Sequence, residues 1–289
     1  NYGTTDPNDP KSPMRKLTAQ RLLVNTRLQI AAALQQRYRR QLGLLNAAQN
    51  EDPRLKALAD QYRQACAQQL DLGEATLADM VAVAPSMFYS GSIMQAFMEL
   101  RSVFAAIDGD AQAMTKYRMA AAAALRNELA RRPFDADLAA RYVMVDFDQL
   151  QTSDMITLLA RPLRLQRPQS IYLDVLRRML ATGGAQMYFA RFDHLGELPV
   201  PQDRVNWPDP WVPETLRLGS IMAYLQADYA RATHYLQAAL PYYAALDGEA
   251  LLAHASTYAE LADMQFNAAP QDVTPAIDSA QQALKIAPN

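Results

Sequence analysis

The chain has 289 residues, with 28 basic and 30 acidic side chains, 17 prolines and one cysteine. A chain of this length buries enough surface to fold without disulfides or metals, and a single cysteine excludes an intrachain disulfide and a cysteine-based zinc cluster. Half of the residues are hydrophobic and a fifth are charged, which is typical of a globular protein, and the sequence has no apolar run long enough to predict a membrane span.

Good helix formers dominate the chain, and runs of Val, Ile and Thr with a period of two are missing. The sequence therefore predicts an all-α fold. Residues 1–13 contain turn formers without an apolar period, so a flexible lead-in is expected there. Because residue 1 is Asn and cysteine is nearly absent, the expected compartment is that of an exported, periplasmic bacterial protein, with the cytoplasm as the alternative.

Residues 14–84 are predicted to form an N-terminal helical hairpin and a further short helix. Asn50–Pro53 ends the first helix, and the second is expected to end near Gly73 before a short helix over 74–84. The first helix carries an apolar stripe that recurs every seven residues: Leu17, Val24, Ala31, Tyr38 and Leu45.

Residues 85–196 are predicted to be helix-pair repeats. Three prolines, Pro133, Pro168 and Pro201, lie 35 and 33 residues apart, which suits repeats of about 34 residues. The expected pairs are 87–107 with 111–131, 135–150 with 153–165, and 170–181 with 185–195, the last with a turn at Gly183-Gly184.

Residues 197–213 break this period. The segment holds five prolines and both tryptophans of the chain, so it is expected to be an extended connector. Four further helices are predicted after it, over 214–226, 229–246, 249–266 and 273–286.

Residues 214–289 resemble the tetratricopeptide repeat. An Asp228-Tyr229 turn joins the two helices, Ala244 stands where a closing proline is usual, and Pro288 closes a second helix B. Small and large residues fall where that repeat places them: Leu216, Ser220, Ala223, Ala232, Leu236, Ala239, Leu240, Ala276, Ala280 and Ala283.

The resemblance implies a right-handed α-solenoid of such repeats, preceded by the N-terminal hairpin. In that fold, helix A of each repeat lines a concave groove that holds a peptide or helix of a partner. The groove residues that the resemblance implies are Arg217, Tyr224, Tyr258 and Asp263.

The side chains able to carry catalysis or bind metals do not form a recognisable set. His194, His234 and His254 lack metal-ligand spacing, and each is expected to be a surface or packing residue. Cys66 is expected to be a buried, inert thiol. Asp146 and Asp148 lie on different faces of one helix, which does not suit a shared ion. No catalytic residue, metal or cofactor is therefore predicted.

Basic residues concentrate in the first helix. Between Pro10 and Glu51 the chain has eight basic residues and no acidic one, which leaves a net charge of −10 for the rest. This basic helix fits an anionic membrane surface, an acidic partner, or another copy of the chain associating through 14–70, and nucleic acid fits less well. The alternative is a solvated face. Its residues are Lys11, Arg15, Lys16, Arg21, Arg27, Arg37, Arg39 and Arg40.

The Trp207–Trp211 segment has two interpretations. The two rings either contact a ligand or peptide, or fill a seam between two blocks of repeats. The function predicted for the whole chain is a non-catalytic protein–protein interaction scaffold within a larger assembly, such as one of a bacterial cell envelope. The alternatives are a small-ligand-binding protein or enzyme with a pocket near the tryptophans, and an oligomerisation or membrane-surface module driven by the basic helix.

Overall fold

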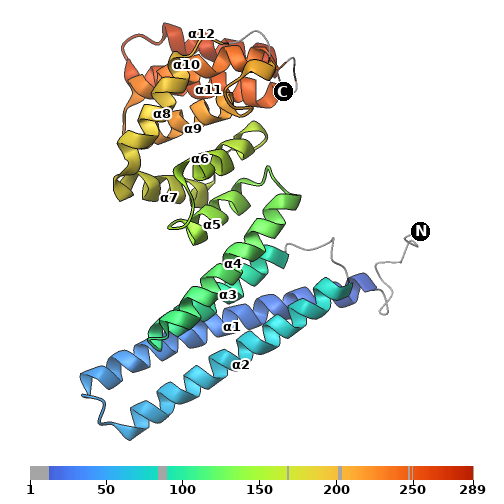
Figure 1. The fold of residues 1–289 in the computed structure, drawn as a ribbon, viewed down its shortest axis with the longest axis vertical. Coiled ribbons are helices and arrows are strands. Elements are labelled where there is room, and N and C mark those ends of the chain that lie inside the picture. The colour runs from blue at the N-terminus through green and yellow to red at the C-terminus, as the bar shows by residue number, and fades with distance from the viewer. Residues whose placement is uncertain are drawn as a thin grey trace. The chain divides into compact units, whose positions relative to one another are not determined.

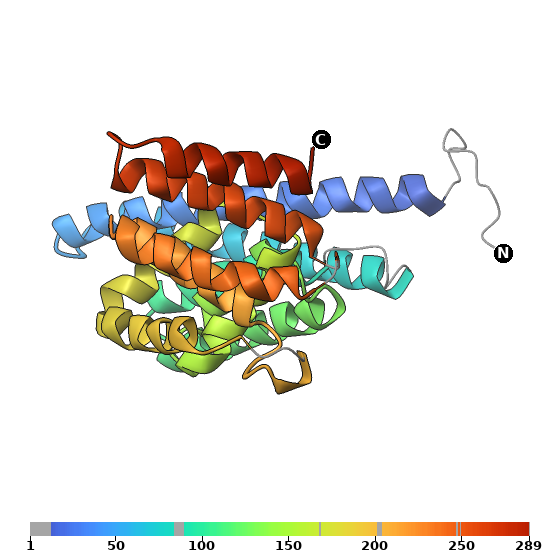
Figure 2. The same ribbon diagram turned by 90° about the horizontal axis from the view of Figure 1, so that it is seen from above.

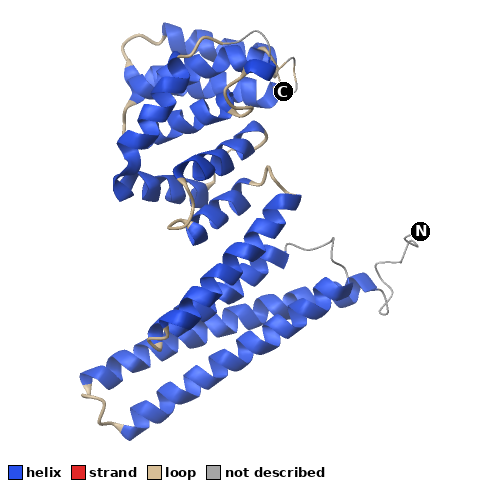
Figure 3. Ribbon diagram, in the orientation of Figure 1, coloured by secondary structure: helices blue, strands red, loops and turns tan. Residues whose placement is uncertain are grey.

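The computed structural model describes residues 13–83, 90–167, 169–200, 204–246, 248 and 250–288. These residues form twelve α-helices with short connections and contain no strand (Figure 3). The prediction of an all-α fold is therefore confirmed. The chain divides into two compact units, residues 1–128 and 129–289, and each has its own hydrophobic core. None of the described helices carries an apolar stretch that could cross a bilayer.

The first unit holds three helices and most of a fourth. α1 and α2 lie side by side as a long hairpin, and α3 packs on both of them (Figure 1). The predicted lead-in lies outside the described residues apart from Pro13, and so does the predicted break at Pro85. The helices are α1 (Pro13–Ala47), α2 (Pro53–Val83), α3 (Ser90–Ile107) and α4 (Ala111–Arg131), whose last residues belong to the second unit.

The heptad stripe of α1 is the inner face of the hairpin, and all five of its predicted residues are buried. The chain reverses after α1 through Gln49 and Asn50, which both adopt left-handed backbone conformations. α2 then starts with Pro53 in its first turn, behind Asp52, whose Oδ1 accepts a hydrogen bond from the Arg54 amide at 2.8 Å. A capping aspartate followed by proline is a typical helix start.

The prediction that the second helix ends near Gly73 is wrong, because α2 continues to Val83. The glycine is there for packing. A Cβ at Gly73 would lie 2.3 Å from Cζ of Phe97, a ring of α3 that is fully buried. The missing side chain therefore lets α3 approach α2 closely, and no separate short helix follows.

Polar contacts also hold α3 on the hairpin. The Gln35 side chain on α1 donates to the Leu100 carbonyl at 3.0 Å. At the end of α3, Asp108 accepts hydrogen bonds from the Tyr38 hydroxyl at 3.0 Å and from Nη2 of Arg63 at 2.7 Å. These contacts fix the side of the hairpin that α3 covers.

The second unit contains eight α-helices and three shorter helical turns in its described part. They are α5 (Ala136–Asp146), α6 (Thr152–Ala160), the 3-10 turn η1 (Arg161–Arg164), α7 (Ser170–Met179), the π-helical segment η2 (Leu180–Gly184), α8 (Ala185–Glu197), the 3-10 turn η3 (Arg204–Asn206), α9 (Val212–Leu225), α10 (Tyr229–Ala244), α11 (Leu251–Ala268) and α12 (Thr274–Ile286).

Two local predictions fail in this unit. Gly183 and Gly184 do not form a turn, because η2 carries the chain from α7 into α8 without a break. Gly184 makes room for packing, since a Cβ there would lie 2.7 Å from the ring of Tyr188. The expected extended connector contains η3, and α9 already begins at Val212 with Pro213 in its first turn, where proline is tolerated.

The last four helices follow the predicted boundaries to within two residues. Each packs on the next, α9 on α10, α10 on α11 and α11 on α12, and α12 lies alongside α11 in both views (Figures 1 and 2). Asp228 caps α10 by accepting a hydrogen bond from the Arg231 amide at 3.0 Å. Packing in neighbouring pairs is compatible with a helical repeat.

Candidate functional site

Arg217, the first predicted groove residue, lies in the core of the second unit. It is on α9 with 1% of its surface exposed. Its Nε and Nη2 donate to the Glu260 carboxylate of α11 at 2.8 and 2.5 Å, and Nη1 donates to the Leu163 carbonyl of η1 at 2.6 Å. Arg217 therefore joins α9, α11 and η1 from the inside.

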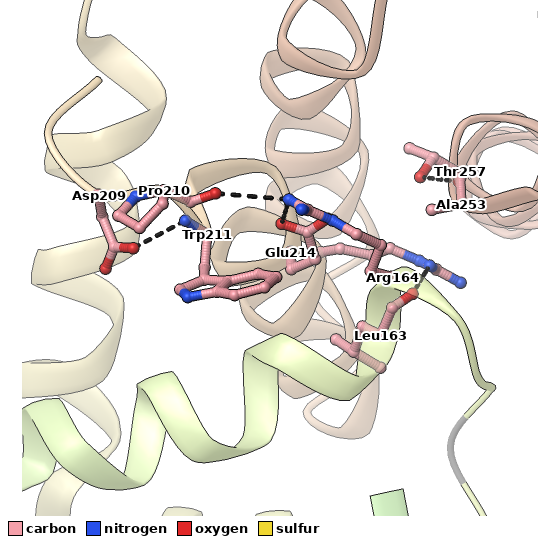
Figure 4. Close-up of polar contacts among 9 residues, drawn as sticks. Leu163, Arg164, Asp209, Pro210, Trp211, Glu214, Ala253 and Thr257 are labelled. Carbon is pink, nitrogen blue, oxygen red and sulfur yellow. Dashed lines mark hydrogen bonds and ion pairs between the residues drawn. The ribbon is translucent and has the colours of Figure 1, made fainter. Parts of the chain in front are cut away.

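A second arginine–glutamate pair lies beside the first. Nε and Nη2 of Arg164 donate to the two carboxylate oxygens of Glu214 at 2.7 and 3.0 Å, and the Glu214 side chain is fully buried (Figure 4). The Arg164 guanidinium also stacks on the Trp211 ring, with 4.4 Å to its centroid. This pair fixes η1 to the first turn of α9.

Burial and the charged partner act in opposite directions on the pKa values of Glu214 and Arg217. Burial raises the pKa of Glu214, and the hydrogen bonds and charge of Arg164 oppose that rise. For Arg217, burial lowers the pKa, but the hydrogen bonds and charge of Glu260 outweigh it, so the pKa is raised overall. A guanidinium stays charged at any physiological pH, so each arginine is matched by one carboxylate and the two pairs carry little net charge.

A cavity of about 240 Å³ opens above these pairs, between η1 with the loop after it and α11. Leu165 and Leu252, which belong to its lining, are 57% and 64% exposed. Arg167 is exposed too, and it forms no ion pair with any described residue. The lining residues are Leu163, Arg164, Leu165, Gln166, Arg167, Arg217, Leu252, Ala253 and Ser256.

The chemistry of this lining suits binding. The described residues that form it offer an uncompensated guanidinium, one hydroxyl and exposed leucines, with no carboxylate, imidazole or thiol among them. Such a surface attracts an anionic group and an apolar group together.

The two tryptophans are packing residues in this structure. Trp207 is 7% exposed, and its ring meets that of Tyr242 edge-on with 5.1 Å between centroids. Trp211 is half-buried, between the guanidinium of Arg164 and the ring of Phe134, whose centroid lies 5.8 Å away. Neither ring lines the cavity.

The remaining groove candidates lie apart from the cavity. Tyr224 is exposed near the end of α9, and its ring centroid is 5.9 Å from that of Tyr229. Tyr258 is half-buried on α11 and stacks on His254, while Asp263 is exposed near the end of that helix. None of these three residues is in the lining of the cavity that includes Arg217.

The basic helix is mostly solvent-exposed. Arg27 is the half-buried member and donates to the Gln69 side chain of α2 at 3.1 Å. Lys11 lies outside the described residues. The exposed members are Arg15, Lys16, Arg21, Arg37, Arg39 and Arg40.

The other chemically interesting side chains also have an ordinary place in the fold. Cys66 is fully buried, and burial raises the pKa of its thiol to about 11, which disfavours the reactive thiolate. His254 lies between the rings of Tyr243 and Tyr258, at 6.1 and 5.4 Å between centroids. Among the described residues, no group of three or more His, Cys, Asp or Glu side chains is placed to hold a metal ion.

The sequence interpretation missed most of this site. Arg164, Arg167, Glu214, Glu260 and Leu252 were not singled out. One usable signal was the run Arg161-Pro-Leu-Arg-Leu-Gln-Arg167, which places three arginines and a proline at the end of the helix predicted over 153–165. The carboxylate partner of Arg164 is Glu214 on α9, 50 residues further along the chain.

Comparison with known proteins adds no relative: no family model, curated protein or solved structure matches the chain.

Proposed function

We propose that this protein is a non-catalytic interaction scaffold, whose second unit is a right-handed α-solenoid of tetratricopeptide-like repeats that holds an extended segment of a partner protein in the Arg167 cavity. The observation that carries the proposal is the pairing of exposed Leu165 and Leu252 with the unpaired Arg167 at the mouth of one cavity.

The small size of the cavity favours a peptide as the occupant. Pockets for drug-sized ligands measure roughly 300–1,000 Å³. A cavity of about 240 Å³ takes one or two side chains instead. An extended peptide supplies these and continues over the neighbouring surface, where Leu251 is also exposed.

The charge of the site favours an acidic segment. Arg164 and Arg217 each form an ion pair with a glutamate, so these two arginines position the elements that line the cavity. Arg167 supplies the free positive charge. We therefore expect a segment with an Asp, a Glu or a terminal carboxylate next to a large apolar residue, the first for Arg167 and the second for the two leucines.

The repeat assignment rests on two observations. Four tetratricopeptide-like residues of α9 and α10, namely Leu216, Ala223, Ala232 and Ala239, are fully buried, which supports the assignment. Small side chains at such positions let consecutive helices approach closely. Each of the last four helices also packs mainly on the next one in the chain.

Selection from a phage-displayed library of random 12-residue peptides tests the proposal. The full chain should enrich peptides that combine acidic and large apolar residues. Arg167→Glu should weaken binding of the selected peptides at least about tenfold, because attraction becomes repulsion, and Leu252→Asp should do the same. Binding is measured by fluorescence anisotropy.

The control is Met119→Glu, a charge-introducing change at a 69% exposed residue of α4 outside the cavity. It should leave the affinity unchanged. Selected peptides that bind the Arg167→Glu and Leu252→Asp variants as well as the parent chain would show that the cavity is not the binding site, and a selection that enriches no peptide would contradict the proposed function itself.

A further inference from the structure

α1 carries a second heptad row besides the buried one. Its members are Lys16, Leu23, Ile30, Arg37 and Leu44, spaced by seven residues. Leu23, Ile30 and Leu44 are 42%, 42% and 48% exposed, and Lys16 and Arg37 are exposed as well. We call these five residues the open row.

The open row lies on the flank of the hairpin that α3 leaves uncovered. α3 contacts the other flank of α1, where Gln35 donates to the Leu100 carbonyl. On α2, Leu70 and Leu77 are buried toward α3, so Leu72, which is 41% exposed, lies on the opposite flank. Since Arg27 bonds to Gln69, Leu72 is at about the level of Leu23 and Ile30. Both helices thus show apolar side chains on one side that α3 does not cover.

The heptad spacing of the open row indicates a helix as its occupant. Apolar residues every seven positions along a coiled-coil hairpin are the pattern that another helix packs against. A lipid bilayer does not require apolar residues at a spacing of seven. It would also have to accommodate the charged Arg37, which lies between the apolar Ile30 and Leu44.

The charge of α1 indicates what kind of helix fits. The helix has seven basic side chains and no acidic one. Placing the open rows of two copies together would juxtapose these charges, which disfavours a symmetric dimer through this surface. An acidic helix would pair with Lys16 and Arg37 while it covers the leucines.

We propose that the open row is the docking surface for an acidic amphipathic α-helix of a partner protein, which packs lengthwise against the hairpin of α1 and α2. This surface belongs to the first unit and is separate from the Arg167 cavity of the second.

A synthetic 28-residue peptide with Leu at heptad positions a and d and Glu at e and g tests this proposal, since at 1.5 Å rise per residue it spans about 42 Å, the distance from Lys16 to Leu44. Its twin carries Lys at e and g. Vesicles of phosphatidylcholine with 30% phosphatidylserine provide the membrane. Binding of each probe to the full chain is measured by titration calorimetry at two salt concentrations.

The acidic peptide should bind and the basic twin should not, with weaker binding at higher salt. The variant Ile30→Gln/Leu44→Gln and the variant Arg37→Glu should each weaken binding about tenfold, whereas Met119→Gln, a matched change on α4, should not. Circular dichroism should show unchanged helicity in all variants because the altered side chains are exposed.

Three outcomes would overturn the proposal: binding of the acidic peptide that the open-row variants retain, no binding of that peptide at all, or binding of the vesicles alone. A homodimer in light scattering that Ile30→Gln/Leu44→Gln dissociates would also overturn it, in favour of self-association.

Discussion

At the scale of single residues, the second unit is organised around charges removed from water. Arg217 and Glu214 are almost fully buried, yet neither lacks a partner of opposite charge. Burying an ion pair costs desolvation, so such pairs contribute less to stability than to the choice of one arrangement. Here they fix the positions of η1, α9 and α11 relative to one another, and those elements line the cavity.

Removing one member of a buried ion pair should lower the free energy of unfolding much more than removing both members. Arg217→Met should lower the free energy of unfolding by about 3 kcal/mol, because it leaves Glu260 and the Leu163 carbonyl without their donor. The double variant Arg217→Met/Glu260→Met should recover part of that loss. Urea denaturation of the three chains measures this, and a double variant less stable than the single one would contradict it.

His254 gives the second unit a pH-dependent stability. Its ring is partly buried between Tyr243 and Tyr258, and burial lowers the pKa of the imidazole below its ordinary value of 6.5. Below that value the unfolded chain binds the proton more readily than the folded one. The contribution of the neutral ring is therefore fully present above pH 6.5 and is lost as the pH falls through the lowered pKa.

We expect the free energy of unfolding to fall between pH 7 and pH 5.5, and His254→Gln to make this fall smaller. The exposed His194 provides the control, and His194→Gln should leave the pH dependence as it is. Denaturation curves of the three chains at several pH values measure this dependence. Identical pH profiles for the parent chain and His254→Gln would rule out this role for the ring.

At the scale of helices, Gly73 explains how α3 docks on the hairpin. In the middle of a helix, an alanine ordinarily stabilises the helix by about 1 kcal/mol relative to a glycine. In α2 this gain is reversed, because the added Cβ would overlap the buried Phe97 ring.

Gly73→Ala should therefore destabilise the chain by about 1–3 kcal/mol, as overpacking of a core does. Gly43 of α1 is the matched control, since a Cβ there meets no atom within 4 Å. Gly43→Ala should stabilise the chain by about 0.5–1 kcal/mol. Both values come from thermal or urea denaturation, and a stabilising Gly73→Ala would contradict the packing described for Phe97.

These glycines show which parts of the fold a sequence can predict. Helix ends were predicted where a local signal marks them, such as Asp52-Pro53 before α2 and Asp228 before α10. Gly73 was misinterpreted because its role depends on Phe97, 24 residues further along the chain. A local pattern does not contain that contact.

The candidate site was harder to predict for the same reason. Arg217 was assigned to a groove from its position on helix A, but its burial depends on Glu260, 43 residues away. The heptad stripe of α1 was predicted correctly, because periodicity alone determines which face of a long helix is buried.

At the scale of the whole molecule, the chain combines two units with separate cores and different surfaces. The first presents basic and apolar side chains along one long helix. The second presents a small cavity with one unpaired arginine and exposed leucines. We propose an acidic segment of another protein as the occupant of each surface, and for the first unit the excess of basic side chains on α1 favours it.

Hydrogen–deuterium exchange of the full chain, with and without a saturating selected 12-residue peptide, tests whether the cavity of the second unit holds the partner segment. We expect slower exchange in residues 161–167 and 251–256, which surround the cavity, and unchanged exchange in α1 and α2. Protection confined to α1 and α2, or no protection in either cavity segment, would contradict it.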